Sequence, residues 1–223
     1  EVFAQVIDDQ VVDDAPLRIQ HARVQRLAGG LELVDRVGQQ AAQERLDLVA
    51  AQNIPWRFAW AGQIFSAGDM RFSVLNPLPD NVGQSAKLNI NNASTVLRAD
   101  YHDLSLLLTG DAEKPVENKL IARFGVNPPA QPPTGDKGDK GGLLDIDILK
   151  LGHHGSKTST TAALLAAASP RAAVISVGAD NKYGHPSPDV LDRLGDLPVW
   201  RTDQNGSVKF IFLDNRWHVK TKK

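Results

Sequence analysis

The chain has 223 residues, enough for one large domain or two small ones around a substantial hydrophobic core. Hydrophobic residues make up 42% and charged residues 23%, and the formal net charge of −1 indicates neither nucleic acid nor an anionic membrane as a partner, although it leaves room for a local basic groove. The chain contains no Cys, which excludes disulfide scaffolds, thiolate zinc sites and cysteine nucleophiles.

The ends of the chain and its apolar runs bear on its location. No apolar run reaches the roughly 18 residues of a membrane-spanning helix, and the N-terminus lacks the basic-then-apolar pattern of a signal peptide. The lack of Cys suits cytosol and periplasm alike, so the composition leaves the compartment open. Because the chain starts at Glu1 without Met, we expect a fragment or an excised domain.

The first 52 residues are polar and only weakly periodic. Residues 7–14 fit either a short strand or a charged loop. Residues 31–51 combine spaced apolar side chains with good helix formers, which predicts a mostly helical segment.

From Trp56 onward the pattern changes to β-structure. Strands are expected over residues 57–60, 70–75, 94–99 and 104–108, and the last of these is nearly continuous in apolar residues, as buried strands are. A helix is expected over residues 112–124, with Pro115 in its first turn. Residues 125–142 are rich in Pro and Gly, which predicts a flexible surface loop.

The C-terminal part alternates strands and helices. The expected elements are a strand over 146–151, a helix over 160–168, a strand over 173–177, a loop over 181–188, a helix over 188–194, and strands over 198–201, 208–212 and 217–220. This alternation predicts one α/β domain with some antiparallel structure at its end.

Two of the expected strands each end in potential metal ligands. Asp111 follows the strand over residues 104–108, and His153 and His154 follow the strand over residues 146–151. In open α/β sheets, sites gather at the carboxyl ends of the strands, so these groups should meet. Such ligands suit Zn²⁺, Mn²⁺ or Fe, and carboxylate-bridged metal pairs serve attack on phosphate esters. The plainer interpretations are a helix N-cap for Asp111 and a buried structural role for the His pair.

Two further motifs carry polar side chains that suit hydrolysis. His185 lies in a loop pinned by Gly184 and Pro186, and its ordinary pKa suits a proton donor to a leaving oxygen. The amide of Asn91, just before the strand over residues 94–99, suits the orientation of a metal-bound water or a phosphate oxygen. The plainer interpretations are an ordinary loop histidine and a turn asparagine.

In this order, the motifs resemble those of the hydrolase domain of ComEC/Rec2-type competence proteins, a branch of the metallo-β-lactamase superfamily. The resemblance runs from about Trp56 to Phe212, roughly two-thirds of the chain. The residues that carry it are Asn91 and Ser94, Leu107 to Asp111, His153 to Ser156, Asn181 to Pro186, and Arg201, Thr202 and Asp203 with Gly206.

This resemblance implies an α/β fold of the αββα sandwich type, with one or two divalent metals, Zn or Mn, and hydrolysis of a phosphodiester. It implies Asp111 as a bridging ligand, His154 as a terminal ligand, and His153 beside the metals. The expected catalytic residues are His153, His185 and Asn91, and the expected substrate-binding residues are Ser94, Ser156, Asn181 and Tyr183.

The resemblance also implies partners and a location. DNA or another phosphodiester would be the substrate, in association with a membrane DNA-uptake channel. The site would then lie in the periplasm or on the extracytoplasmic face; otherwise a cytoplasmic location is expected.

The N-terminal part departs from the superfamily pattern. Such enzymes carry a His-x-His-x-Asp-His signature that supplies most metal ligands, and its place here is residues 18–30. Only His21 remains as a ligand there, with Arg23, Gln25 and Arg26 in the other slots. Arginine stays protonated, so it cannot ligate a metal and it repels a dication.

Three explanations of this departure stay open. The alignment is accidental and the true signature lies upstream of Glu1; the site has decayed and the chain is a pseudoenzyme; or the first fifty residues were altered by the history of the clone or its reading frame. Near the N-terminus lies an acidic cluster of Asp8, Asp9, Asp13 and Asp14. Its carboxylates would replace the missing metal ligands, or the cluster would form a solvated loop.

Three functions follow from these observations. The first is a metal-dependent phosphodiesterase or nuclease acting in DNA uptake, and the second is a catalytically impaired relative that serves as a binding domain. The third is another hydrolase of the superfamily, such as a phosphorylcholine esterase or a β-lactamase. The β-lactamase is disfavoured, because Asn91 and Asn92 stand near the place where a third histidine is expected.

Overall fold

The computed structural model describes residues 3–6, 47–53, 59–78, 90–125, 142–214 and 216–222. The chain divides into two compact units, of which one contains residues 13–59 and the other contains residues 1–12 and 60–223. In the smaller unit, residues 47–51 are helical and fall within the predicted helix over 31–51. The remainder of that prediction, the strand or loop at 7–14 and the interior of the 125–142 loop lie outside the described residues.

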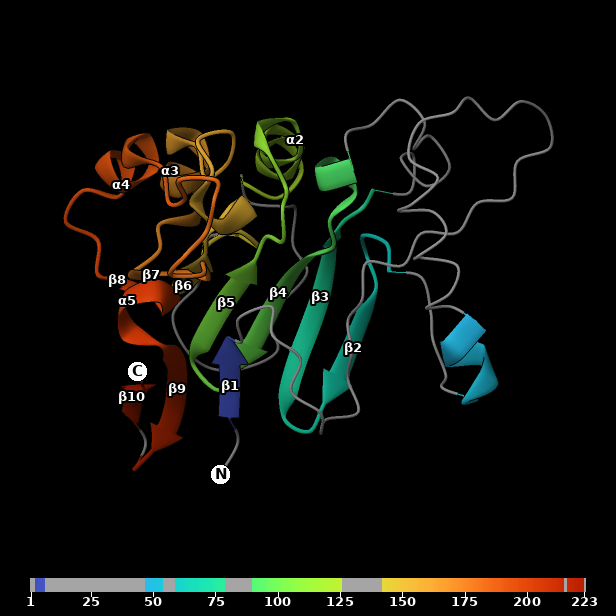
Figure 1. The fold of residues 1–223 in the computed structure, drawn as a ribbon. Coiled ribbons are helices and arrows are strands. Elements are labelled where there is room, and N and C mark those ends of the chain that lie inside the picture. Colours follow the sequence, from blue (N-terminus) through green and yellow to red (C-terminus); the bar gives the residue numbers. More distant parts are fainter. Residues whose placement is uncertain are drawn as a thin grey trace, which may run out of the picture. The chain divides into compact units, whose positions relative to one another are not determined.

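The larger unit contains a seven-stranded mixed sheet (Figure 1). Its strands follow the order β2-β3-β4-β5-β6-β7-β8, antiparallel from β2 to β5 and parallel from β5 to β8. The bounds are β2 Ile64–Ala67, β3 Met70–Asn76, β4 Val96–Tyr101, β5 Leu104–Leu108, β6 Ile148–Lys150, β7 Ala172–Ile175 and β8 Val199–Arg201. The parallel strands therefore bring their carboxyl ends to the same edge of the sheet.

Three helices pack on one face of this sheet: α2 Lys114–Phe124, α3 Ala162–Ala168 and α4 Pro188–Leu194 (Figure 1). The core between these layers joins Leu107 and Leu149 of the sheet to Leu120, Leu164 and Val190 of the helices, and all five are fully buried. Alternation along the strands places every second side chain in this core.

The opposite face carries a three-stranded antiparallel sheet in the order β1-β9-β10, formed by β1 Phe3–Val6, β9 Ser207–Leu213 and β10 Arg216–Lys222. A second core joins Leu106 and Ile148 of the large sheet to Val208 and Phe210 of β9. The described residues thus confirm an α/β fold with a large mixed sheet flanked by helices. This arrangement is compatible with an αββα sandwich.

Most of the predicted elements are present, and β5 and α4 have the predicted bounds. The strand predicted over residues 57–60 is wrong at its described end. Residues 59–63 instead include a turn, in which the backbone N–H of Trp60 donates to Gln63 Oε1 and that of Gln63 to the Trp60 carbonyl. The unpredicted β2 follows this turn, and the short α5, Thr202–Asn205, was also not predicted.

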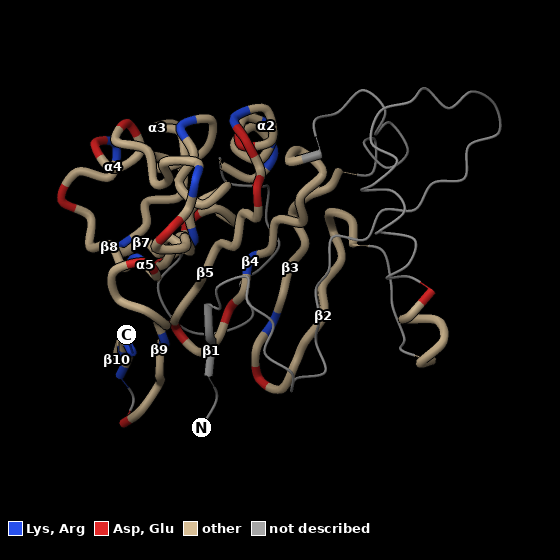
Figure 2. The backbone as a smooth tube through the Cα atoms, viewed as in Figure 1, with Lys and Arg blue, Asp and Glu red and all other residues tan. Residues whose placement is uncertain are grey.

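Lys and Arg are spread over several elements with acidic residues among them (Figure 2), in line with the net charge of −1. In the parts of the chain that the structure describes, none of the helices combines the length and the apolar character needed to cross a membrane.

Candidate functional site

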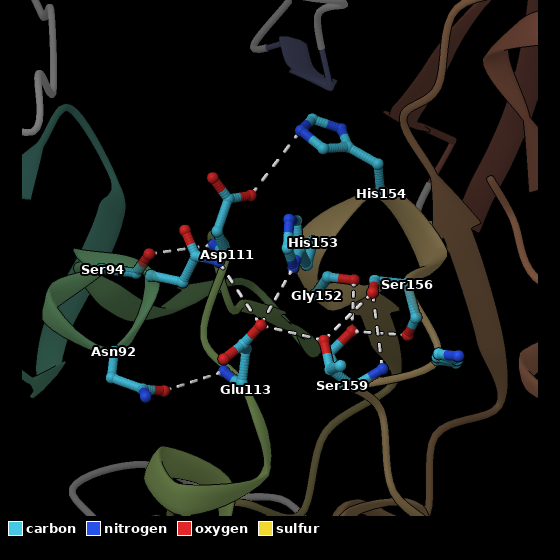
Figure 3. Close-up of polar contacts among 12 residues, drawn as sticks. Asn92, Ser94, Asp111, Glu113, Gly152, His153, His154, Ser156 and Ser159 are labelled. Atoms are coloured by element: carbon cyan, nitrogen blue, oxygen red, sulfur yellow. Dashed lines mark hydrogen bonds and ion pairs between the residues drawn. The ribbon is translucent and has the colours of Figure 1, made fainter. Parts of the chain in front are cut away.

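The predicted ligands meet at the carboxyl ends of adjacent strands. Asp111 follows β5, and His153 and His154 follow β6 within the short 3-10 helix η4, Gly152–Gly155. His154 Nε2 lies 3.6 Å from Asp111 Oδ1 (Figure 3). The side chains of Asp111 and His154 are 40% and 33% exposed, so both remain open to a ligand from solvent.

The ring of His154 is oriented by a backbone group. Its Nδ1 lies 2.8 Å from the carbonyl of Ser176, just beyond β7. A carbonyl only accepts hydrogen bonds, so Nδ1 carries the proton of the neutral ring. The lone pair of Nε2 is then directed to the side where Asp111 lies. In metal-binding histidines, one ring nitrogen likewise donates a hydrogen bond and the other is left for the metal.

The backbone of Asp111 is held by Ser94, which lies between the 3-10 helix η3, Ile90–Ala93, and β4. The Asp111 N–H donates to Ser94 Oγ at 3.0 Å, and Ser94 is itself buried. Helix α2 begins at Lys114, with Glu113 at the N-cap position. The N-cap interpretation of Asp111 is therefore wrong, and its carboxylate is available for another role.

The backbone of η4 is unusual at both histidines. His153 and His154 have positive φ angles of 48° and 55°, a conformation that costs non-glycine residues on the order of 1–3 kcal/mol. The hydrogen bonds that hold it include those from His153 N–H to the Gly110 carbonyl at 2.9 Å and from Ser159 Oγ to the Gly152 carbonyl at 2.7 Å. Both imidazoles are only half-buried, so a fully buried structural role does not describe them.

Glu113 is a member of the site that the sequence did not indicate. Its Oε1 lies 3.5 Å from His153 Nδ1, an ion-pair distance rather than a hydrogen bond. The same oxygen accepts from Thr158 Oγ1 at 2.9 Å and from Asn91 Nδ2 at 3.4 Å. The backbone N–H of Glu113 donates to Asn92 Oδ1 at 3.4 Å (Figure 3). Asn91, predicted to be catalytic, therefore lies beside Glu113.

His185 joins the site from the loop after β7. Its ring lies 5.8 Å from that of His153, centroid to centroid. Burial, and then the nearby imidazoles of His153 and His154, lower the pKa of His185 below its ordinary value of 6.5. The lowered pKa reduces the fraction of His185 rings that carry a proton to donate at a given pH.

The loop that carries His185 packs directly on η4. The backbone N–H of Ser187 donates to the Gly155 carbonyl at 2.9 Å. A Cβ atom at Gly155 would lie 2.6 Å from Pro186 Cβ, so only glycine fits there. Asn181 closes the loop, because its side chain accepts from His185 N–H at 2.9 Å and donates to the His185 carbonyl at 2.8 Å.

Four residues of the predicted motifs have their side chains in contacts within the chain. Ser94 is bonded to Asp111, and Ser156 Oγ lies 3.0 Å from Thr158 Oγ1. Asn181 closes its own loop. Thr202 Oγ1 accepts from the Val177 N–H and donates to the Val177 carbonyl. Substrate binding by Ser94, Ser156 and Asn181 stays a prediction.

The metal-binding capacity of the site is partial. Within the described ranges, no group of three or more His, Asp or Glu side chains lies close enough to hold a metal ion. Asp111 and His154 together supply two donors. His21, with Arg23, Gln25 and Arg26, lies outside the described residues.

Comparison with known proteins identifies relatives, although no family model matches the chain. ComE operon protein 3 of Bacillus subtilis (strain 168) is 32% identical over 92% of this chain and 24% of its own length. Competence protein ComA of Neisseria gonorrhoeae is 30% identical over 82% of this chain and 23% of its own length. Recombination protein 2 of Haemophilus influenzae is 33% identical over 73% of this chain and 18% of its own length.

These relatives support the predicted relation to ComEC/Rec2-type competence proteins. The chain spans a quarter or less of the length of each, so what the whole relatives do is not carried over with the similarity. Assignment to the metallo-β-lactamase superfamily stays a prediction.

Proposed function

We propose that this chain is the metal-dependent phosphodiesterase or nuclease part of a competence-type DNA-uptake protein, with the fold of the metallo-β-lactamase superfamily. The observation that carries the proposal is the pairing of His154 Nε2 with Asp111 Oδ1 at 3.6 Å, while the Ser176 carbonyl occupies His154 Nδ1. The relatives include a competence protein, which supports a competence-type setting, and within it we propose DNA uptake in association with a membrane channel.

The donor set fits one half of a metal site. Asp111 and His154 offer a carboxylate and an oriented imidazole, which suit Zn²⁺ or Mn²⁺. We expect the remaining ligands to come from residues outside the described ranges, with His21 as the first candidate. A divalent metal in this place would supply positive charge for the phosphate oxygens and a bound water of lowered pKa.

Proton donation and binding of the phosphodiester are assigned to the other histidines of the site. His153 turns Nδ1 to Glu113, which leaves Nε2 as the nitrogen for the leaving oxygen of the substrate. We assign proton donation to His153, because its Nδ1 faces Glu113 and its Nε2 is thereby left for the leaving oxygen. His185 then acts as a neutral hydrogen-bonding partner of the phosphodiester.

A second function has an observation in its favour. The described residues contain no group of three metal-binding side chains, and the sequence places Arg23, Gln25 and Arg26 where the superfamily has ligands. A chain that keeps the fold but binds no metal would serve as a non-catalytic binding domain. Metal content separates the two functions directly.

The full chain would be loaded with Zn²⁺ or Mn²⁺, desalted and analysed for metal. We expect about one metal per chain or more, with a clear loss in Asp111→Asn and His154→Asn. His218→Asn provides the matched control, because His218 is exposed on β10, and it should retain the metal. Less than about half a metal per chain in the unmodified protein would overturn the enzyme and favour the binding domain.

Activity would be measured on bis-p-nitrophenyl phosphate, single-stranded DNA and a chromogenic β-lactam side by side. We expect hydrolysis of the two phosphodiesters, with a loss of about 100-fold or more in Asp111→Asn. Turnover of the β-lactam alone would overturn the phosphodiesterase assignment while leaving the metal site in place.

A further inference from the structure

Tyr183 has an exposed ring beside the candidate site. At 83% exposure it is the most open of the large hydrophobic side chains that the structure describes. Its ring stacks on that of His185, with centroids 5.9 Å apart and planes inclined by 25°. One face of the tyrosine therefore leans on an imidazole, while most of the ring stays in contact with solvent.

The loop presents this ring in a fixed position. The side chain of Asn181 makes three hydrogen bonds within the loop, two with the backbone of His185 and one to the Gly178 carbonyl at 3.0 Å. Pro186 packs against Gly155, which ties the loop to η4. A platform that is already in place loses little conformational entropy when a ligand stacks on it.

The rings form a row that leads from solvent to the metal-binding pair. Tyr183 stacks on His185 at 5.9 Å, and His185 lies 5.8 Å from His153. The ring of His153 lies 6.4 Å from that of His154, whose Nε2 faces Asp111. A ligand that contacts Tyr183 would thus lie two ring-to-ring steps from His153.

We propose that Tyr183 is a stacking platform for an unpaired nucleobase of the strand whose phosphodiester is hydrolysed beside His153. This assignment rests on the proposed function and adds to it a residue that recognises the base. Every nucleobase offers a π-face, and stacking on an aromatic side chain strengthens binding by about tenfold per base with little sequence preference. In an intact duplex the base faces are covered by neighbouring pairs, so the platform favours single strands.

Positive charge next to Tyr183 and next to the His-His-Gly-Ser run would hold the nucleic-acid strand without distinguishing its bases. Lys182 precedes Tyr183 and Lys157 follows Ser156 of the His-His-Gly-Ser run, and both side chains are exposed. Attraction between lysine and phosphate is independent of sequence and weakens with salt. A strand that lacks bases should therefore retain this part of the affinity and lose the part that Tyr183 provides.

The test compares the binding of three fluorescent oligonucleotides to the full, metal-free chain: oligo-dT, an abasic strand of equal length, and a blunt duplex. Fluorescence anisotropy at one fixed salt concentration gives the dissociation constants. We expect oligo-dT to bind about tenfold more tightly than the abasic strand. Tyr183→Phe should keep this preference, whereas Tyr183→Leu, similar in bulk but without a π-face, should bind both strands as the unmodified chain binds the abasic one.

Two kinds of result overturn the assignment, and they are distinguishable. Equal affinity for oligo-dT and the abasic strand, a preference that persists in Tyr183→Leu, or a duplex bound as tightly as oligo-dT would remove the stacking role alone. Absence of binding to all three would remove nucleic acid as the substrate as well. Because Tyr183 is on the surface, the thermal unfolding of each variant should match that of the unmodified chain, which excludes misfolding as the cause.

Discussion

Ser176 contributes to the site through its backbone carbonyl, which fixes the orientation of His154. The neighbouring His153 is oriented differently, since Nδ1 of that ring faces the side chain of Glu113. The two imidazoles are adjacent in sequence, but the groups that face their Nδ1 atoms come from different parts of the fold. A change at Glu113 should therefore affect His153 and leave the contact between His154 and Asp111, the proposed metal ligands, intact.

Glu113→Ala should lower kcat on bis-p-nitrophenyl phosphate by about 10- to 100-fold without loss of metal. The physical reason is that His153 loses the carboxylate that orients its ring. Ring ¹⁵N NMR should show a smaller fraction of His153 with the proton on Nδ1, while the signals of His154 stay unchanged. Glu113→Asp should recover part of the rate. If metal content falls together with the rate, Glu113 supports the metal site instead.

The pKa of His185, followed by NMR in the metal-free chain, should lie below 6.5. Burial and the imidazoles of His153 and His154 on η4 disfavour its charged form, and Tyr183 on its own loop stacks on the ring. The unfolded chain then binds more protons than the folded chain between the two pKa values. His185 therefore costs stability below its folded pKa, and this cost disappears as the pH rises to 6.5.

His153→Asn should raise the pKa of His185 toward 6.5, because one of the charges that disfavours the imidazolium is removed. His218→Asn, on the exposed strand β10, should leave the titration unchanged. A titration of His185 that is identical in His153→Asn and the unmodified chain would contradict the electrostatic contribution.

Among the elements, the contact between η4 and the loop over residues 181–186 determines whether the His pair and His185 meet. Gly155 lies at its centre, with φ at +82° and Pro186 closely packed on it. Gly184, in the same loop, has φ at +68° but nothing within 4 Å of the place of a Cβ. These two glycines separate the effect of a steric clash from the effect of backbone strain.

Gly155→Ala should lower the free energy of unfolding by about 1–3 kcal/mol and reduce metal content, because the loop must move away from η4. Gly184→Ala should cost only the backbone strain, about 1 kcal/mol, and retain the metal. Urea unfolding of the three chains measures the free energies. Equal losses in the two variants would show that the contact with Pro186 is not what requires glycine.

The sequence predicted those parts of the site that depend on strand order. Asp111 and His154 could be placed together because sites form at the carboxyl ends of parallel strands. Glu113 was missed because its role depends on the path of the chain from β5 to α2. Glu117 of α2 was missed for a related reason: it is fully buried, and its carboxylate accepts from the backbone N–H groups of Thr160 and Thr161 at the start of α3. A buried carboxylate is indicated only by its partners, which are distant in sequence.

At the scale of the whole molecule, the proposed metal site lacks a third ligand among the described residues. The chain contains six His. His102 stacks on Phe212 at 4.3 Å and His218 lies on β10, while three others form the candidate site. The sixth, His21, lies outside the described residues, and its role as a ligand stays a prediction.

Metal binding should stabilise the folded chain, since a ligand held by the folded state alone shifts the unfolding equilibrium. At a metal concentration 100 times Kd the gain is about 2.7 kcal/mol, which corresponds to a rise in Tm of about 5–10 °C for a chain of this size. Asp111→Asn should abolish the rise and His218→Asn should keep it. If His21 is a ligand, His21→Asn reduces the rise at the same metal concentration; a full rise in that variant would mean that oxygen ligands, such as those of the acidic cluster at residues 8–14, complete the site.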